Sequence, residues 1–169
     1  MIQVLGAVLI TGGASWLGFW AARSLDQAWK DLRTAVEAMA FLERELEWDN
    51  PPLPELLKRL VHQCSDPIKG IFQELLKSLD VLGEITLADA WFRLVEKERA
   101  FGEEVKEALL PLGNVLGRYS CEEQRQAAHR IRLHLEGIEE ELMEEKKRKG
   151  KLYRVLGVSG GSFLALLLL

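Results

Sequence analysis

The two ends of this 169-residue sequence contain no charged residue. Every Lys, Arg, Asp and Glu lies between Arg23 and Arg154, so residues 1–22 and 155–169 carry none. Val, Ile and Thr are sparse compared with Leu, Glu, Lys, Arg and Ala, and no stretch alternates between apolar and polar residues. This excludes a sheet fold, and the length allows one domain, so we expect an all-α chain.

The residues that reactive or metal-binding sites require are also few. The chain has two cysteines and three histidines. His129 and His134 are five residues apart, so they diverge on a helix and do not form a zinc pair. No glycine-rich loop follows a strand, and no nucleophile stands beside a base. We therefore expect no enzyme activity, no cofactor, no metal and no small-molecule substrate.

The uncharged N-terminal segment is long enough to cross a bilayer. Residues 1–22 would extend about 33 Å as a helix, against a hydrocarbon core of roughly 30 Å. No basic residue precedes the apolar run, and Trp20-Ala21-Ala22 matches a signal-peptide cleavage site poorly. We expect a retained transmembrane helix over residues 1–22, and the alternative is a cleaved signal peptide.

The uncharged C-terminal segment is shorter. Residues 155–169 span about 22 Å as a helix, and adding Leu152 and Tyr153 gives about 27 Å, with Arg154 reaching back to the interface. A buried core helix is the alternative. The run LALLLL is apolar on all sides, and a basic cluster precedes it. We therefore expect a second transmembrane helix over residues 152–169.

Basic residues border both apolar segments. Arg23, Lys30 and Arg33 follow the first, and six precede the second: Lys146, Lys147, Arg148, Lys149, Lys151 and Arg154. Basic residues are retained on the cytoplasmic side of a membrane and attract anionic lipid. This predicts a cytoplasmic bundle of about six helices, residues 23–151, with a transmembrane helix at each end. The net charge of −4 and the position of the cluster argue against nucleic acid. Free thiols at Cys64 and Cys121 fit the cytoplasm.

Prolines, glycines and capping patterns divide the middle into helices. A first helix continues from the membrane and stops at "DNPPLP", where three prolines within four residues end it. Further helices are predicted from Pro54 to Ser65, from Pro67 to Leu79, and from the capping residue Thr86 to Arg99. The next runs over Glu103–Leu116, where Pro111 should kink it or split it. Gly117 offers a C-terminal cap.

The last helix is the longest. Ser120-Cys-Glu-Glu123 is a capping box, and the helix it opens continues past Lys151. Its apolar spine follows steps of three and four residues: Ala128, Ile131, Leu135, Ile138 and Leu142. This spacing predicts that the helix packs on the first helix of the same chain.

Small residues recur in the apolar ends. Gly157 and Gly161 form a GxxxG pattern, and Ala14 and Gly18 form a looser version of it. Such patterns allow helices to approach closely in lipid. We expect these residues to pack transmembrane helices together.

The chain resembles the stage III sporulation protein AB family of endospore-forming bacteria over its whole length. Five segments in order carry the resemblance: LGAVLITGGASWLGFWAARSL, FLERELEWDNPPLPELLKRL, ITLADAWFRLVE, LLPLGNVLGRYSCEEQ and KLYRVLGVSGGSFLALLLL. The resemblance implies a reduced relative of the type II secretion F-type platform protein, in the mother-cell membrane around the forespore. The implied partners are a secretion-type ATPase, the stage III sporulation protein AA, and other membrane components of the channel between the two cells.

If the two long helices run antiparallel, their distant ends meet about 35–40 Å from the bilayer. This end would then bind the ATPase, through Glu43, Glu45, Glu47, Trp48, Pro52, Leu53, Arg118, Tyr119, Glu123 and Gln124. The alternative is that Trp48 and Leu53 are buried and the acids only cap helices and solubilise the chain. Two other functions stay open: a membrane-tethered helical adaptor with another cytoplasmic partner, and a secreted helical protein with a cleaved N-terminus.

Overall fold

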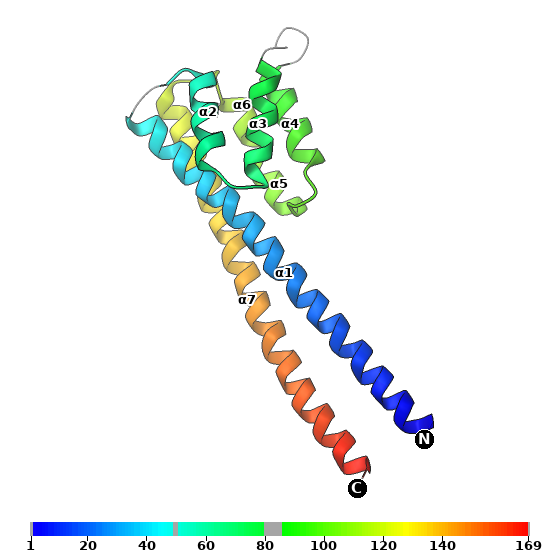
Figure 1. The fold of residues 1–169 in the computed structure, drawn as a ribbon. Helices are drawn as coiled ribbons and strands as arrows, with labels where there is room; N and C mark the ends of the chain where they lie inside the picture. The colour runs from blue at the N-terminus through cyan, green and yellow to red at the C-terminus, as the bar shows by residue number, and fades with distance from the viewer. Residues whose placement is uncertain (1, 49–50, 80–85, 169) are drawn as a thin grey trace. The chain divides into compact units, whose positions relative to one another are not determined.

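The computed structural model describes the backbone of residues 2–48, 51–79 and 86–168 and the side chains of residues 23–48, 51–79 and 86–148. These residues form seven α-helices and no strand (Figure 1). The helices are α1 (Ile2–Trp48), α2 (Leu53–Gln63), α3 (Ile68–Ser78), α4 (Leu87–Lys97), α5 (Glu103–Leu109), α6 (Pro111–Val115) and α7 (Cys121–Leu168). The predicted all-α fold is confirmed.

The helix ends follow the local sequence signals. Thr86 caps α4 by accepting a hydrogen bond from the Asp89 backbone N–H over 3.2 Å, and its hydroxyl donates to the Asp89 carboxylate over 2.7 Å. Ser120 and Glu123 form the same arrangement at the start of α7. Pro111 splits the predicted fifth helix into α5 and α6, because a proline supplies no N–H to continue the hydrogen-bond ladder.

The chain forms two compact units. One contains residues 28–140, and the other contains the two chain ends, residues 1–27 and 141–169. In the first unit, the ends of α1 and α7 run antiparallel and α2 to α6 lie together against them (Figure 1). In the second unit, Lys146 of α7 donates to Asp26 of α1.

The core of the first unit is apolar and includes most of the residues that the periodicity predicts. Large, fully buried side chains come from each of the helices α1 to α6: Leu32, Met39 and Leu42 in α1, Leu56, Leu57 and Leu60 in α2, Ile68, Phe72 and Leu75 in α3, Trp91 in α4, Leu109 in α5 and Leu112 in α6. The spine of α7 is buried at Ala128, Ile131 and Leu135, and half-buried at Ile138 and Leu142.

Trp91 is the largest side chain in this core. Its ring lies 5.6 Å from the Phe72 ring, and its Nε1 donates to the Leu109 carbonyl oxygen over 2.9 Å. Gly113 of α6 lies directly against it, since a Cβ on Gly113 would stand 2.6 Å from Trp91 Cδ1. The absence of a side chain at Gly113 therefore allows α6 to approach α4.

Both cysteines are free thiols, as predicted. Cys64 follows the last residue of α2 and is half-buried. Burial, helped by the charge of Glu37, raises the pKa of the Cys64 thiol to about 11. The thiol therefore stays protonated at neutral pH and is a poor nucleophile.

The structure describes the backbone of the two predicted membrane anchors but not their side chains. The backbone of residues 2–22 and 152–168 is helical, as the ends of α1 and α7. Within the described part of the chain, no helix combines the length and the apolar character needed to cross a bilayer. The anchors over residues 1–22 and 152–169 stay a prediction.

Candidate functional site

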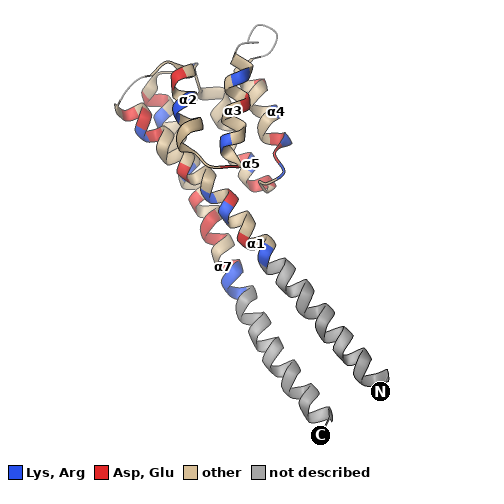
Figure 2. Cartoon of the chain, viewed as in Figure 1, with Lys and Arg blue, Asp and Glu red and all other residues tan. Residues whose placement is uncertain are grey.

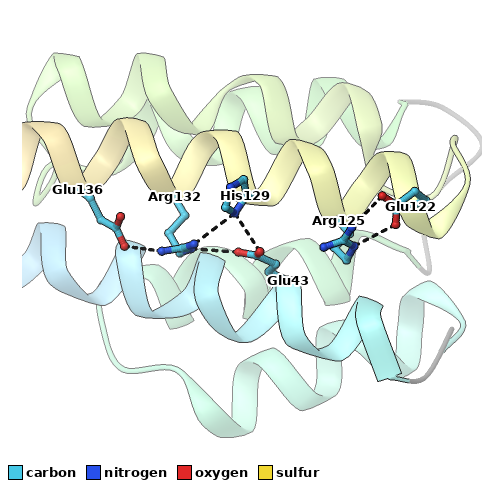
Figure 3. Close-up of polar contacts among 6 residues, drawn as sticks. All are labelled: Glu43, Glu122, Arg125, His129, Arg132 and Glu136. Atoms are coloured by element: carbon cyan, nitrogen blue, oxygen red, sulfur yellow. Dashed lines mark hydrogen bonds and ion pairs between the residues drawn. The ribbon is translucent and has the colours of Figure 1, made fainter.

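The far end of α1 and the start of α7 are joined by a network of polar side chains (Figure 3). Glu43 of α1 accepts a hydrogen bond from Arg132 Nε over 3.0 Å, and its other oxygen lies 2.9 Å from His129 Nδ1. Arg132 also donates to Glu136 over 2.6 Å. The pair of long helices that the apolar spacing predicts is thus also held by charge, at one defined register.

These contacts shift the ionisation of the groups that make them. The hydrogen bond that Arg132 donates to Glu43 raises the pKa of Arg132 against the opposing effect of burial. The hydrogen bonds from Arg125 and Gln126 lower the pKa of Glu122, and Glu122 in turn raises the pKa of Arg125. The charges of Glu47 and Glu43 make a smaller contribution to the raised pKa of Arg125.

The predicted acidic residues of α1 divide into two kinds. Glu43 and Glu45 are partly buried and face partners within the bundle, Glu45 through an ion pair of 2.9 Å with Arg59 of α2. Glu47 is exposed. Trp48, the last residue of α1, is 84% exposed, so the alternative in which it is buried is wrong.

Pro52 and Leu53 lie at the start of α2. Pro52 is exposed and occupies the N-cap position, and Leu53 is half-buried. Leu53 packs against the turn between α6 and α7, because a Cβ on Gly117 would stand 3.0 Å from Leu53 Cδ2. Gly117 has φ +69°, in the left-handed region that favours glycine. The start of α2 therefore meets the residues that lead into α7.

The four predicted residues around the start of α7 also differ. The Glu123 carboxylate accepts hydrogen bonds from the Ser120 backbone N–H and hydroxyl. These hydrogen bonds lower the pKa of Glu123. Gln124 closes the turn, donating to the Tyr119 carbonyl oxygen over 2.7 Å and accepting from the Gly117 N–H over 3.4 Å. Arg118 and Tyr119 are exposed. The charge of Arg118 contributes to a lowered pKa of Asp89, after the larger effect of Thr86.

The structure thus brings the predicted residues to one end of the unit formed by residues 28–140. Five exposed members define a surface that we call the tip: Glu47, Trp48, Pro52, Arg118 and Tyr119. Glu43 and Glu45 pair with basic residues of neighbouring helices, Leu53 and Gln124 contact the turn at Gly117, and Glu123, which is also exposed, caps α7 at Ser120. The sequence reading missed His129, Arg132, Glu122 and Arg125. The spacing of three between His129 and Arg132 was a signal that both lie on one face of α7.

The predicted basic cluster is described only in part. Lys147 and Arg148 are exposed, and Lys146 contacts Asp26. The side chains of Lys149, Lys151 and Arg154 lie outside the described residues, as do the predicted helix-packing residues Ala14, Gly18, Gly157 and Gly161. In the portion of the chain whose side chains are described, no three His, Cys, Asp or Glu residues gather to hold a metal ion.

Comparisons with known proteins all point to one family. The family model of stage III sporulation protein AB matches residues 3–169. The stage III sporulation protein AB of Bacillus subtilis strain 168 is 26% identical over 172 residues, covering 100% of both chains. A solved structure titled stage III sporulation protein AB (SpoIIIAB) matches with a TM-score of 0.58 and 21% identity, over 70% of this chain and 94% of that chain, and therefore shares its fold. This chain belongs to the stage III sporulation protein AB family.

Proposed function

We propose that this chain is a non-enzymatic platform of the channel between mother cell and forespore. Its two uncharged ends anchor it in the mother-cell membrane around the forespore, and the charged middle lies in the cytoplasm. The platform couples a secretion-type ATPase, the stage III sporulation protein AA, to the other membrane components of the channel. A role in sporulation follows from the family.

The continuity of the two long helices carries this proposal. α1 is one helix from Ile2 to Trp48, and α7 is one helix from Cys121 to Leu168. Each predicted anchor is therefore part of the same helix as a side of the bundle. Two anchors would restrict the movement of the charged middle more than one anchor would.

The polar side chains at the tip end support a scaffold rather than a reaction centre. Glu43, His129, Arg132 and Glu136 form contacts that join α1 to α7, and Glu45 joins α1 to α2 through Arg59. Polar side chains that pair with one another between helices fix the register of those helices. The exposed residues above them are suited to contact with another protein.

Deletion of the gene in the source organism tests the platform role. Development should arrest after engulfment, and the full-length chain should restore heat-resistant spores. A chain lacking residues 152–169 should fail, whereas the same chain with an unrelated transmembrane segment in their place should restore the process at least in part. Normal sporulation of the deletion strain would contradict the platform role.

The coupling to the ATPase requires a separate measurement. The full chain, extracted in mild detergent from sporulating cells, should co-purify with the ATPase and with membrane proteins of the channel. Recovery of the membrane proteins without the ATPase would contradict the coupling while leaving the platform role in place. Release of the chain by carbonate would contradict the membrane anchors.

A further inference from the structure

One ring nitrogen of His129 contacts two side chains that require opposite hydrogen-bonding roles from it. His129 Nδ1 lies 2.9 Å from a carboxylate oxygen of Glu43 and 3.2 Å from Nη2 of Arg132 (Figure 3). An ionised carboxylate only accepts hydrogen bonds, and a guanidinium only donates them. Nδ1 must therefore carry a proton to bond with Glu43 and must lack one to bond with Arg132. It serves only one of the two at a time.

The two partners of His129 lie on different helices. Glu43 belongs to α1, whereas Arg132 belongs to α7 and follows His129 by three residues. A hydrogen bond to Glu43 joins the two long helices, and a hydrogen bond from Arg132 stays within α7. The role that Nδ1 takes thus adds or removes one link between α1 and α7.

The other nitrogens of Arg132 are engaged with carboxylates. Nε donates to the second oxygen of Glu43 over 3.0 Å, and Nη1 donates to Glu136 over 2.6 Å. Nη2 is the nitrogen that faces His129. A neutral ring with its proton on Nε2 offers Nη2 a lone pair at Nδ1, so all three guanidinium nitrogens then donate.

Further charged groups lie on the same two helices. Figure 2 shows acidic and basic residues mixed along the paired ends of α1 and α7. Arg125, one turn before His129 on α7, donates to Glu122, and the charge of Glu47 from α1 also acts on Arg125. The His129 side chain is 45% exposed. Protons from solvent therefore reach the ring.

We propose that His129 is a pH-sensitive link between α1 and α7. When the ring is neutral, Nε2 carries the proton and Nδ1 accepts a hydrogen bond from Arg132. A proton taken up from solvent binds at Nδ1, which then donates to Glu43 and forms an ion pair between the two helices. Histidine side chains change charge between about pH 5 and 8, so mild acidification adds this link. The proposal does not depend on the proposed function.

NMR of the full-length chain in detergent micelles tests the protonation of Nδ1. The nitrogen chemical shifts of ¹⁵N-labelled histidine show which ring nitrogens carry a proton, and His129→Ala identifies the signal. Nδ1 of His129 should be unprotonated at pH 8 and protonated at pH 5.5. A protonated Nδ1 at pH 8 would overturn the proposal, because the hydrogen bond to Glu43 would then exist at both pH values.

A double-mutant cycle measures the link to Glu43. Wild type, His129→Ala, Glu43→Gln and the double variant are unfolded by heat at pH 5.5 and at pH 8. At pH 5.5, His129→Ala should lower the Tm by about 2–4 °C more in the wild-type chain than in the Glu43→Gln chain, since an ion pair is lost. At pH 8 the two losses should be equal. Groups that titrate independently cancel within each cycle.

Two further cycles sharpen the test. His129→Ala with Arg132→Gln should show the reverse pattern, with coupling at pH 8 and none at pH 5.5. His134→Ala with Glu43→Gln is the matched control, because His134 is an exposed histidine of the same helix and should show no coupling at either pH. Equal coupling of His129 to Glu43 at both pH values, or a pH-dependent coupling of His134, would overturn the proposal.

Discussion

The core around Trp91 and the tip around Trp48 use the same kind of side chain in opposite ways. Trp91 is surrounded: its ring contacts Phe72, its Nε1 donates to Leu109, and a glycine gives it room. Trp48 is exposed at the end of α1, where the nearby Glu43 and Glu45 form ion pairs with neighbouring helices. The difference indicates that side-chain packing determines the interior of the bundle, whereas ion pairs set the register between α1 and α7.

The largest effect is expected where shape decides the packing. Gly113→Ala places a Cβ within 2.6–2.8 Å of three Trp91 atoms, so α6 or the indole must shift. We expect a loss of about 2–3 kcal/mol in the free energy of unfolding, typical of overpacking in a core. Thermal or urea unfolding of the full-length chain, followed by circular dichroism, measures it.

Gly137→Ala is the matched control for this substitution. A Cβ at Gly137 meets nothing within 4 Å, and the residue lies inside α7. Alanine should therefore stabilise the chain by about 0.5–1 kcal/mol, because glycine is a poor helix former. Equal effects at positions 113 and 137 would show that the close contact with Trp91 does not limit the packing.

The next effect concerns the turn beneath the tip. Gly117 has φ +69°, and its Cβ would come within 3.0 Å of Leu53. Gly117→Ala should cost about 1–2 kcal/mol of the free energy of unfolding, since alanine disfavours the left-handed conformation. Asparagine tolerates this conformation better, so Gly117→Asn should recover part of the loss in the same unfolding assay. An alanine variant as stable as wild type would contradict the role of this turn.

A smaller effect is expected from the ion pairs that join α1 to α7. The Glu43–Arg132 pair is partly buried, whereas the Arg33–Glu37 pair within α1 is exposed. A double-mutant cycle with Glu43→Gln and Arg132→Gln should give a coupling energy of about 1 kcal/mol, decreasing with salt. The same cycle at Arg33 and Glu37 should give about 0.3–0.5 kcal/mol. Equal coupling energies would contradict the idea that charge sets the register of the two helices.

The smallest effect is a dependence on pH at the helix caps. Ser120 lowers the pKa of Glu123 below the ordinary 4.5, and Thr86 lowers the pKa of Asp89 below the ordinary 3.8. A carboxyl with a lowered pKa stabilises the fold above its unfolded pKa, and this contribution is lost as pH falls through the folded value. The Tm should therefore fall as the pH decreases below about 4.5. Glu123→Gln should flatten this decrease, and a slope equal to that of wild type would contradict it.

Much of the fold was predictable because its signals are local. Pro51, Pro52 and Pro54 end α1, Pro111 divides α5 from α6, and the hydroxyls of Thr86 and Ser120 start α4 and α7. Each of these effects depends on backbone geometry within about four residues. The apolar spacing of α7 also predicts which of its residues are buried, since the helix repeat fixes the face.

The tip was predictable as a location but not in its chemistry. The antiparallel pairing of α1 and α7 is sufficient to bring the end of α1 near the start of α7. The sequence gives no means of separating Glu43 from Glu47, because both lie on the last turns of α1 and both are acids. Their partners are on α7, with Arg132 at 89 residues from Glu43 along the chain.

The sequence by itself determined the helices, their ends, and the burial of Trp91, because these depend on periodicity and on residues close in the chain. Only the tertiary structure decided that Glu43 and Glu45 are matched by basic partners and that Trp48 remains exposed. The physical reason is that charge pairing and solvent exposure depend on what approaches from another helix. A run such as Glu-Trp at the end of a helix has no periodic signal that fixes which neighbour covers it.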